Sequence, residues 1–574
     1  MASLRSILSW IPPFLTVLRE LCQSPVWRWG RWFLAAFLAV RLLFWGVVFP
    51  NPDEAYYWLW GQHPSFSYYD HPPFHAWIQG LLATLLGRST WVLRLSNLVS
   101  NGILAVTFYR IGRYLYGDDG GDRLWLTVML LASSPLFFLF LAMAWHDHWL
   151  VTFAVLSGFD FVRFLDGYQA NGRGKSHHLY RSALFLGLAG LSKYNAVFVG
   201  LGFLATLLTQ RSLRRLFWDA RLYVALGITA LVLAPIVIWN WQQGFASFQF
   251  YGNRTSGGGF TLNPLQPLVF LLLCALILGP IQSWGILRLG RRWRQVNQNF
   301  VRPSLYPVVA GWIFILSTGT FVALSLVSVA LYYWNILAYP LLFPLLADRF
   351  YRPSRLPDPD QADTSYREIP PRPTRHLQDQ PDRDGLSPLR YPRQMLVAQG
   401  LGLFVVAALT FHYTVIPITA LFGPADNDSA ALFGWEEIAA AVTAQAETLD
   451  NPLLLTTDYR SAAALAYALD DPSVLAISGR LDQSDFWYDM ESLEGRDAVL
   501  LGEDWHPICP AHLAMFDRTS DPQTLTIQRL GRPIQTYHLV TGYSLRAKAT
   551  GSPLDPAYPL AFTTDGERCE LDVP

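Results

Sequence analysis

The chain has 574 residues, of which 52% are hydrophobic and only 15% charged, and its mean hydropathy is +0.23. A soluble protein of this size would not stay in solution with so few charges, so the composition indicates a polytopic membrane protein. Its 43 basic and 43 acidic residues cancel. This balance offers no basic surface for nucleic acid, and we expect no nucleic-acid partner.

Residues 1–30 precede the first long apolar run. Within them, Ile7–Leu21 has an amphipathic pattern that is too interrupted for a cleaved secretory signal. We therefore expect residues 1–30 to form an N-terminal interfacial helix.

Apolar runs long enough to cross a bilayer follow one another through residues 31–422. Shorter segments fill the gaps: Leu184–Thr209 is interpreted as a helical hairpin that turns near Lys193, and Ile336–Leu346 as a short return span. The chain is therefore predicted to be mostly α-helical, with about 11 to 13 transmembrane helices. The long runs are Trp32–Phe49, Val92–Tyr114, Leu124–Ala144, Trp149–Leu165, Leu222–Trp239, Leu265–Leu287, Tyr306–Leu331 and Leu396–Leu421.

Arginines and lysines recur in every second loop, from Arg28 and Arg31 to the cluster between Arg288 and Arg294. Loops that stay in the cytoplasm carry this excess, so the pattern predicts a cytoplasmic N-terminus in the plasma (inner) membrane. The loops that contain acidic and aromatic residues then share the outer face.

Residues 349–393 are dense in Pro, Arg and Asp and contain few aliphatic residues. Such a segment cannot bury a core, so we expect a disordered cytoplasmic loop.

Residues 423–574 have a different composition and are predicted to form an extracytoplasmic α/β domain. Cys509 and Cys569 both fall in it, and that compartment permits a disulfide. The predicted elements are the strands Leu453–Thr457, Ser473–Ile477 and Ala498–Leu501, with a helix at Ser461–Leu469.

Two carboxylates, Asp53 and Glu54, directly follow the first span. An enzyme on the outer face cannot use cytosolic nucleotide donors, so an activated sugar must arrive on a phosphorylated polyprenol. Transfer then requires a base for the acceptor and cations for the leaving phosphate. Asp53 is the candidate base and Glu54 the alternative. The competing interpretation is that Asp53 only caps a helix that starts at Ala55.

A second acidic residue, Asp147, lies between His146 and His148 at the start of a later span. Histidines two residues apart point the same way on a strand but not at a helix end, so they are weak candidates for a divalent metal site. Asp147 could also cap the helix that begins at Trp149.

Lys193 is unusual because the chain uses arginine almost everywhere else. Its ammonium could hold a phosphate, or it could simply extend to the membrane interface. Arg254 lies in a glycine-rich segment, Tyr251–Phe260, which is loose enough to close over a substrate or to serve only as a connector.

Aromatic residues cluster after Asp53. Tyr57 and Tyr69 suit stacking on a sugar, and they suit an interfacial aromatic belt equally well.

In combination, these motifs closely resemble those of the GT-C glycosyltransferases, and especially the bacterial branch related to protein O-mannosyltransferases and the lipid A aminoarabinose transferase. The ordered set covers most of the chain from Trp32 onward. It comprises Asp53-Glu54, Tyr69-Asp70-His71 with the following prolines, Asp147, Ser192-Lys193-Tyr194, Trp239-Asn240, Trp334-Asn335, Asp458-Tyr459-Arg460 and Asp485-Phe486-Trp487.

The resemblance implies a GT-C fold and inverting transfer of a sugar from a polyprenyl-phosphate donor to a lipid, protein or glycan acceptor. It implies that Asp53 is the catalytic acidic residue, with Asp147 as the second acidic residue of the cavity. Lys193 would contact the donor phosphate, and Tyr194, Arg254, Tyr57, Tyr69, Asp70 and His71 are the further substrate-binding candidates. No cofactor is required by the motifs, and a divalent metal remains open.

A transporter or flippase of a lipid-linked intermediate is the alternative, because acids, aromatics and a single lysine around a lateral cavity would serve it too. Inverted symmetry between the two halves, the usual sign of a transporter, is not visible in the sequence.

Overall fold

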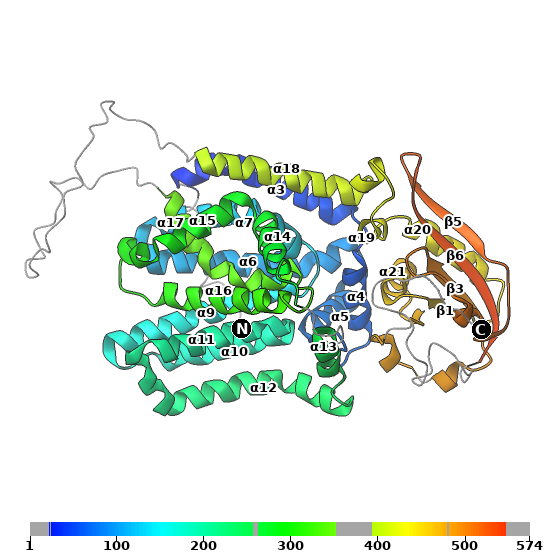
Figure 1. The fold of residues 1–574 in the computed structure, drawn as a ribbon, viewed down its shortest axis with the longest axis horizontal. Coiled ribbons are helices and arrows are strands. Elements are labelled where there is room, and N and C mark those ends of the chain that lie inside the picture. The colour runs from blue at the N-terminus through cyan, green and yellow to red at the C-terminus, as the bar shows by residue number, and fades with distance from the viewer. Residues whose placement is uncertain are drawn as a thin grey trace, which may run out of the picture.

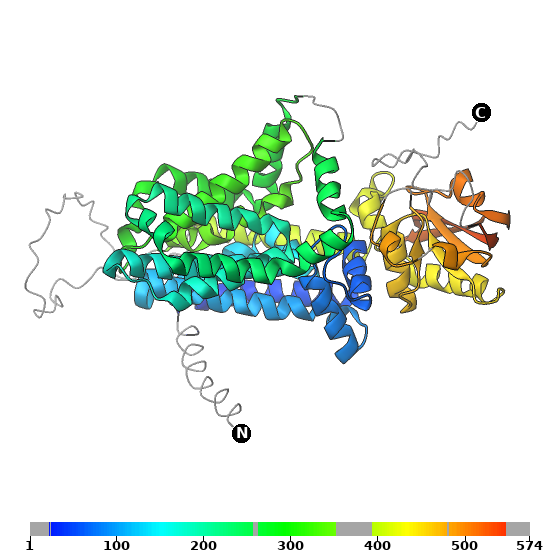
Figure 2. The ribbon, with the colours of Figure 1, turned by 90° about the horizontal axis from the view of Figure 1, so that it is seen from below.

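The computed structural model describes residues 22, 24–256, 262–351, 393–478, 481–488 and 490–546. It consists of a long helical bundle with a smaller sheet-containing domain at one end (Figures 1 and 2). The expected interfacial helix at Ile7–Leu21 and nearly all of the loop at 349–393 lie outside the described residues. Of residues 1–30, the last six already belong to the first helix of the bundle.

The helices of the bundle pack against one another in neighbouring sets. α10 packs between α9 and α12, α11 packs on α16, and α3 packs against α7 and α18. The bundle contains α3 (Pro25–Val47), α4 (Pro52–Gln62), α5 (Phe74–Leu86), α6 (Thr90–Tyr116), α7 (Gly120–Ala132), α8 (Pro135–Ala142), α9 (Asp147–Asn171), α10 (Ser176–Ser192), α11 (Val197–Thr209), η3 (Arg211–Trp218), α12 (Ala220–Gln242), α13 (Ala246–Ser256), α14 (Gln266–Leu278), α15 (Pro280–Arg291), η4 (Trp293–Asn299), α16 (Tyr306–Ser325), η5 (Tyr332–Ala338), α17 (Phe343–Phe350) and α18 (Arg393–Thr414).

Within the described residues, five helical stretches are long and apolar enough to cross a membrane, or up to eight if each bent pair is one span. The predicted hairpin at Leu184–Thr209 is confirmed, since α10 ends at Ser192 and α11 begins at Val197. The segment Tyr251–Phe260 was expected to be a loose loop, but α13 continues to Ser256 because its glycine run only starts at Gly257. The count of 11 to 13 spans remains a prediction.

α4 and α5 form a short hairpin at the end of the bundle that faces the smaller domain (Figure 1). They cross closely where Gly61 faces Gly80, and a Cβ on either glycine would overlap the backbone of the other helix. This close approach fixes the C-terminal end of α4, and Asn51 caps the other end of the helix.

The C-terminal domain is a mixed sheet with the strand order β2-β1-β3-β6-β4, in which β5 pairs with β6. β1 is parallel to β2 and β3, and the remaining pairs are antiparallel. The predicted strands and helix are confirmed as β1, β2, β3 and α21, whereas the strands after β3 were not predicted. The elements are α19 (Asn427–Ala430), α20 (Trp435–Ala446), β1 (Leu453–Thr456), α21 (Tyr459–Leu469), β2 (Leu475–Ala476), β3 (Ala498–Glu503), α22 (Pro510–Leu513), β4 (Phe516–Thr519), β5 (Gln523–Arg529) and β6 (Arg532–Leu545).

The two parts share one hydrophobic core, which runs from α3 and α4 into α20 and α21. Polar contacts add to it: the backbone N–H of Gln483 donates to Tyr56 Oη at 3.0 Å, and the Tyr69 N–H donates to Gln483 Oε1 at 2.7 Å. The C-terminal domain is therefore docked firmly on the α4–α5 hairpin. Cys509 is disulfide-bonded, and the expected partner Cys569 lies outside the described residues.

Candidate active site

A cavity of about 590 Å³ lies where the bundle meets the C-terminal domain. Both parts contribute to its wall, which combines acids, one lysine, one arginine and many aromatic rings. The lining includes Asn51, Asp53, Tyr57, His71, Trp145, Asp147, Lys193, Tyr194, Asn195, Tyr251, Tyr332, Tyr333, Trp334, Tyr413, Asp428, Tyr459 and Arg460.

Asp53 lines this cavity from the first turn of α4. The interpretation of Asp53 as a helix cap is wrong, because Asn51 is the N-cap and its Oδ1 accepts the Asp53 N–H at 3.0 Å. The sequence Asn-Pro-Asp-Glu thus starts a helix with a polar cap and a proline, and leaves the Asp53 carboxylate on the cavity wall.

Glu54 points the other way, into the protein, and is fully buried. Its carboxylate accepts two hydrogen bonds from Arg94, at 2.9 and 2.7 Å, and one each from the backbone N–H groups of Asn51 and Ala144, at 2.9 and 2.7 Å. It does not line the cavity. This placement argues against a role as the alternative base and makes Glu54 the anchor that holds α4 to the bundle.

Asp147 and Lys193 form a second polar centre in the same cavity. Lys193 Nζ lies 2.9 Å from both Asp147 carboxylate oxygens, and both side chains are buried. The capping alternative does not apply to Asp147, since α9 begins at Asp147 itself and its carboxylate holds the lysine. Lys193 likewise does not extend to an interface: it is the C-cap residue after α10, and its Nζ lies 5.6 Å from the centre of the Tyr333 ring.

An ammonium group has three N–H donors. The Asp147 carboxylate accepts two of them, and Tyr333 packs over the ammonium group. The pair is thus a fixed cationic donor with an adjacent negative partner, at a depth where solvent screening is weak.

One histidine lines the cavity and two others do not. His71 lines it, whereas His146 packs on Tyr57 with ring centres 4.0 Å apart. His148 turns away and lies 2.8 Å from Ser100 Oγ through its Nδ1. In the part of the chain that the structure describes, no three His, Cys, Asp or Glu side chains are arranged to hold a metal ion. His146 and His148 diverge, as their spacing at a helix end predicts.

The remaining predicted residues divide into two groups. Tyr57 and Tyr194 line the cavity with His71. Tyr69 instead stacks on Phe486 of the C-terminal domain, and Asp70 accepts a hydrogen bond from Tyr251 Oη through its backbone carbonyl at 2.5 Å. Their placement indicates a part in docking the domain and shaping the wall.

Arg254 lies on α13, and its side chain is outside the described part of the structure.

Arg460 is a cavity residue that sequence reasoning did not select, although it belongs to the quoted motif Asp458-Tyr459-Arg460. Its guanidinium contacts Asp458 at 3.1 Å and the exposed Asp428 at 3.4 Å. Burial lowers its pKa, but the neighbouring carboxylates, with Asp458 first, raise the pKa above the ordinary value. The C-terminal domain therefore brings a permanent cation to the cavity.

Parts of the chain are similar to known proteins. Residues 70–239 match the family model described as dolichyl-phosphate-mannose-protein mannosyltransferase. The lipid A galacturonosyltransferase RgtD of Rhizobium johnstonii is 25% identical over 247 residues, which are 42% of this chain and 49% of that protein. The chain thus spans about half the length of this curated relative.

The fold matches the crystal structure of ArnT from Cupriavidus metallidurans bound to undecaprenyl phosphate, with a TM-score of 0.58 at 15% identity over 92% of this chain and 99% of that chain. ArnT from the same organism in the apo state gives a TM-score of 0.55 at 15% identity, over 90% and 98% of the two chains. The expected GT-C fold is thereby confirmed.

Proposed function

We propose that this chain is an inverting glycosyltransferase that moves a sugar from a polyprenyl-phosphate donor to an acceptor hydroxyl. The observation that carries this proposal is the cavity itself. In a GT-C fold, it holds the Asp53 carboxylate in the same space as the Asp147–Lys193 pair. These are the two functions that the reaction needs: a base for the acceptor and a cation for the leaving phosphate.

In the proposed reaction, Asp53 accepts a hydrogen bond from the acceptor hydroxyl and takes up its proton. The hydroxyl oxygen attacks the anomeric carbon, and the bond from that carbon to the phosphate oxygen breaks with its electron pair. The departing lipid phosphate gains negative charge, which the third N–H of Lys193 stabilises. Tyr57 and Tyr333 supply aromatic walls for the sugar.

Arg460 adds a second cation to the cavity, from α21 of the C-terminal domain. Its contact to Asp428 is long and exposed, so a substrate anion can replace it at little cost. We therefore assign Arg460 to substrate binding rather than to structure.

The same proposal includes the orientation of the chain, with the cavity and C-terminal domain on the extracytoplasmic side. The arginine-rich loops support it because they meet at the opposite end of the bundle. Val301 N–H donates to Leu115 O at 2.9 Å, and Arg221 donates to Gly174 O at 2.9 Å. Each contact joins two loops of the basic series, so the loops are linked in two pairs.

The sugar and the acceptor are open parts of the proposal. RgtD is named for transfer to lipid A, so glycolipids of that kind are the first acceptors to try, followed by protein and glycan acceptors. The transporter alternative is set aside, because the matched family model and RgtD are both named for sugar transfer.

The test is a transfer assay with purified protein in nanodiscs and a panel of radiolabelled polyprenyl-phosphate sugars. Asp53→Asn should abolish transfer, whereas the matched change Asp118→Asn, at an exposed residue, should leave it intact. Full transfer by the Asp53→Asn protein, at matched expression and thermal stability, would refute the proposed role.

A further inference from the structure

A basic helical element lies at the end of the bundle that is remote from the candidate active site. η3 (Arg211–Trp218) follows α11 after a bend of 111°, so it runs across the direction of the membrane-spanning helices. Such a turn at the end of a span places an element along the membrane surface.

The two faces of η3 differ sharply. Leu213 and Leu216 are fully buried against the bundle, whereas Arg211, Arg214 and Arg215 are exposed. The acid next in sequence, Asp219, pairs with Arg221 at 2.6 Å and so does not neutralise the three arginines. η3 therefore presents concentrated positive charge on the side away from the protein core.

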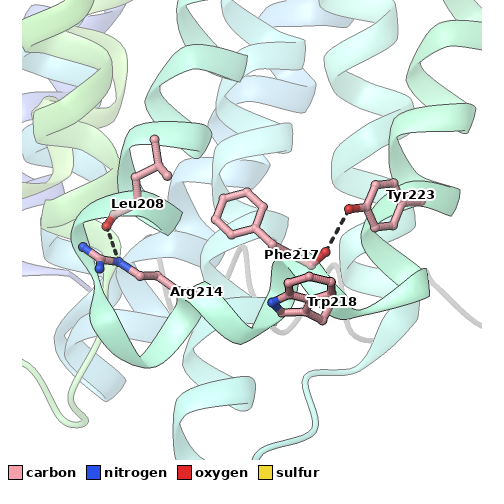
Figure 3. A pocket seen from close by; sticks show the side chains of 5 residues that line it. All are labelled: Leu208, Arg214, Phe217, Trp218 and Tyr223. Carbon is pink, nitrogen blue, oxygen red and sulfur yellow. Dashed lines mark hydrogen bonds between the residues drawn. The ribbon is translucent and has the colours of Figure 1, made fainter.

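A pocket of about 540 Å³ opens beside η3, between the ends of α11 and α12 (Figure 3). Its walls are fixed by two hydrogen bonds: Arg214 Nε donates to Leu208 O, and Tyr223 Oη donates to Phe217 O, both at 2.8 Å. The terminal guanidinium nitrogens of Arg214 have no hydrogen-bond partner within the described residues. Trp218 completes the pocket with its side chain 92% exposed.

Apolar side chains lead from this pocket along α11. Leu201, Leu204 and Leu208 form a stripe on α11 and are 40%, 43% and 49% exposed. Tryptophan and tyrosine side chains favour the level of the lipid head groups, and exposed leucines favour the acyl chains. This order of side chains therefore suits a single amphipathic molecule with a polar head and apolar chains.

We propose that η3 and the adjoining ends of α11 and α12 form a binding site for an anionic phospholipid. The head-group phosphate contacts Arg214 with Arg211 and Arg215 nearby, Trp218 and Tyr223 lie at the glycerol level, and the acyl chains run along the α11 leucines. Charge complementarity selects an anionic head group. This lipid site is separate from the proposed sugar-transfer site, and the test of one does not depend on the result for the other.

The experiment measures binding of dioleoyl-phosphatidylglycerol and dioleoyl-phosphatidylcholine to the full-length protein by native mass spectrometry after release from nanodiscs. The wild-type protein should retain more phosphatidylglycerol than phosphatidylcholine. Arg211→Gln/Arg214→Gln/Arg215→Gln should weaken its binding by about fivefold per arginine, or roughly 100-fold in all. Higher salt should weaken it in the wild type as well.

The matched control is Arg288→Gln/Arg291→Gln/Arg294→Gln, which removes as many charges from another arginine cluster and should leave the selective binding unchanged. If the triple variant does not fold, the double variant Arg211→Gln/Arg215→Gln replaces it, because it keeps the hydrogen bond from Arg214 to Leu208. Its binding of phosphatidylglycerol should be weaker than that of the wild type by roughly 25-fold. Equal binding of the two lipids, or an equal loss in the control variant, would overturn the proposal.

Discussion

Replacing Glu54 by Gln separates a structural role from a catalytic role for the second residue of the Asp53-Glu54 motif. The carboxylate accepts four hydrogen bonds, two from Arg94 and two from backbone N–H groups, and both charged side chains are fully buried. Arg94 also donates to the carbonyls of Phe44, Trp45 and Val48 at the end of α3. This network ties α3, α4 and the segment before α9 together around one ion pair.

Removing the negative charge leaves the guanidinium of Arg94 buried without its counter-ion. Breaking such a pair from one side costs about 3–5 kcal/mol. Glu54→Gln should therefore lower the apparent melting temperature of the purified protein strongly, and lower transfer activity only in proportion to the folded fraction.

The assay is fluorescence-detected size-exclusion chromatography after heating, combined with transfer activity per folded molecule. Glu437→Gln is the matched control, because its ion pair with Arg529 is exposed and should be worth less than about 1 kcal/mol. A Glu54→Gln protein with wild-type thermal stability and no transfer activity would refute this reasoning and restore Glu54 as a candidate base.

Three further predictions follow from the site and the domain interface. Lys193→Met should lower kcat by about 100-fold or more, because the leaving phosphate loses its fixed cation; a kcat within threefold of wild type would contradict this. Arg460→Gln should raise the KM for the anionic substrate when compared at equal folded fraction, and Arg518→Gln, an exposed change in the same domain, should leave the KM unaltered. Burial, with the nearby charge of Asp482, raises the pKa of Asp485 to about 7. Because the unfolded chain ionises at lower pH, the contribution of Asp485 to the stability of the docked domain should be full below about pH 4 and be lost as the pH rises to 7, and Asp485→Asn should remove this part of the pH dependence in melting curves. Parallel slopes for the two proteins would exclude Asp485 as the source.

Much of the site could be predicted from sequence because its residues break the local pattern. Asp53 and Lys193 are charges beside long apolar runs, where a charge without a function is costly, and the structure brings both to one cavity. β1 and β3 could also be predicted, because buried parallel strands have continuous aliphatic runs and both segments show such a run.

The rest depended on contacts between distant segments. Glu54 looked like an alternative to Asp53, since its partner Arg94 is 40 residues away and inside an apolar helix. Tyr69 suited sugar stacking, but its partner Phe486 belongs to the C-terminal domain. Arg460 was missed as a site residue for the same reason: a single sequence does not show that α21 lies over the cavity.

Hydropathy alone also could not resolve the short helices. α5 and α11 have 13 residues each, too few for a full span by the length criterion, and they pack as parts of hairpins. The loop at Tyr251–Phe260 was expected to be irregular on the strength of its glycines, whereas the residues before them continue α13.

The most direct test of the central claim is to measure donor binding and lipid-phosphate release in the same sample of purified protein, with wild type and Asp53→Asn side by side. If the cavity transfers sugar by the proposed displacement, wild type releases polyprenyl phosphate when acceptor is present, and Asp53→Asn binds the donor with similar affinity but releases none. Release at the wild-type rate by Asp53→Asn, or donor binding by wild type without release in the presence of cell-envelope acceptors, would contradict the account.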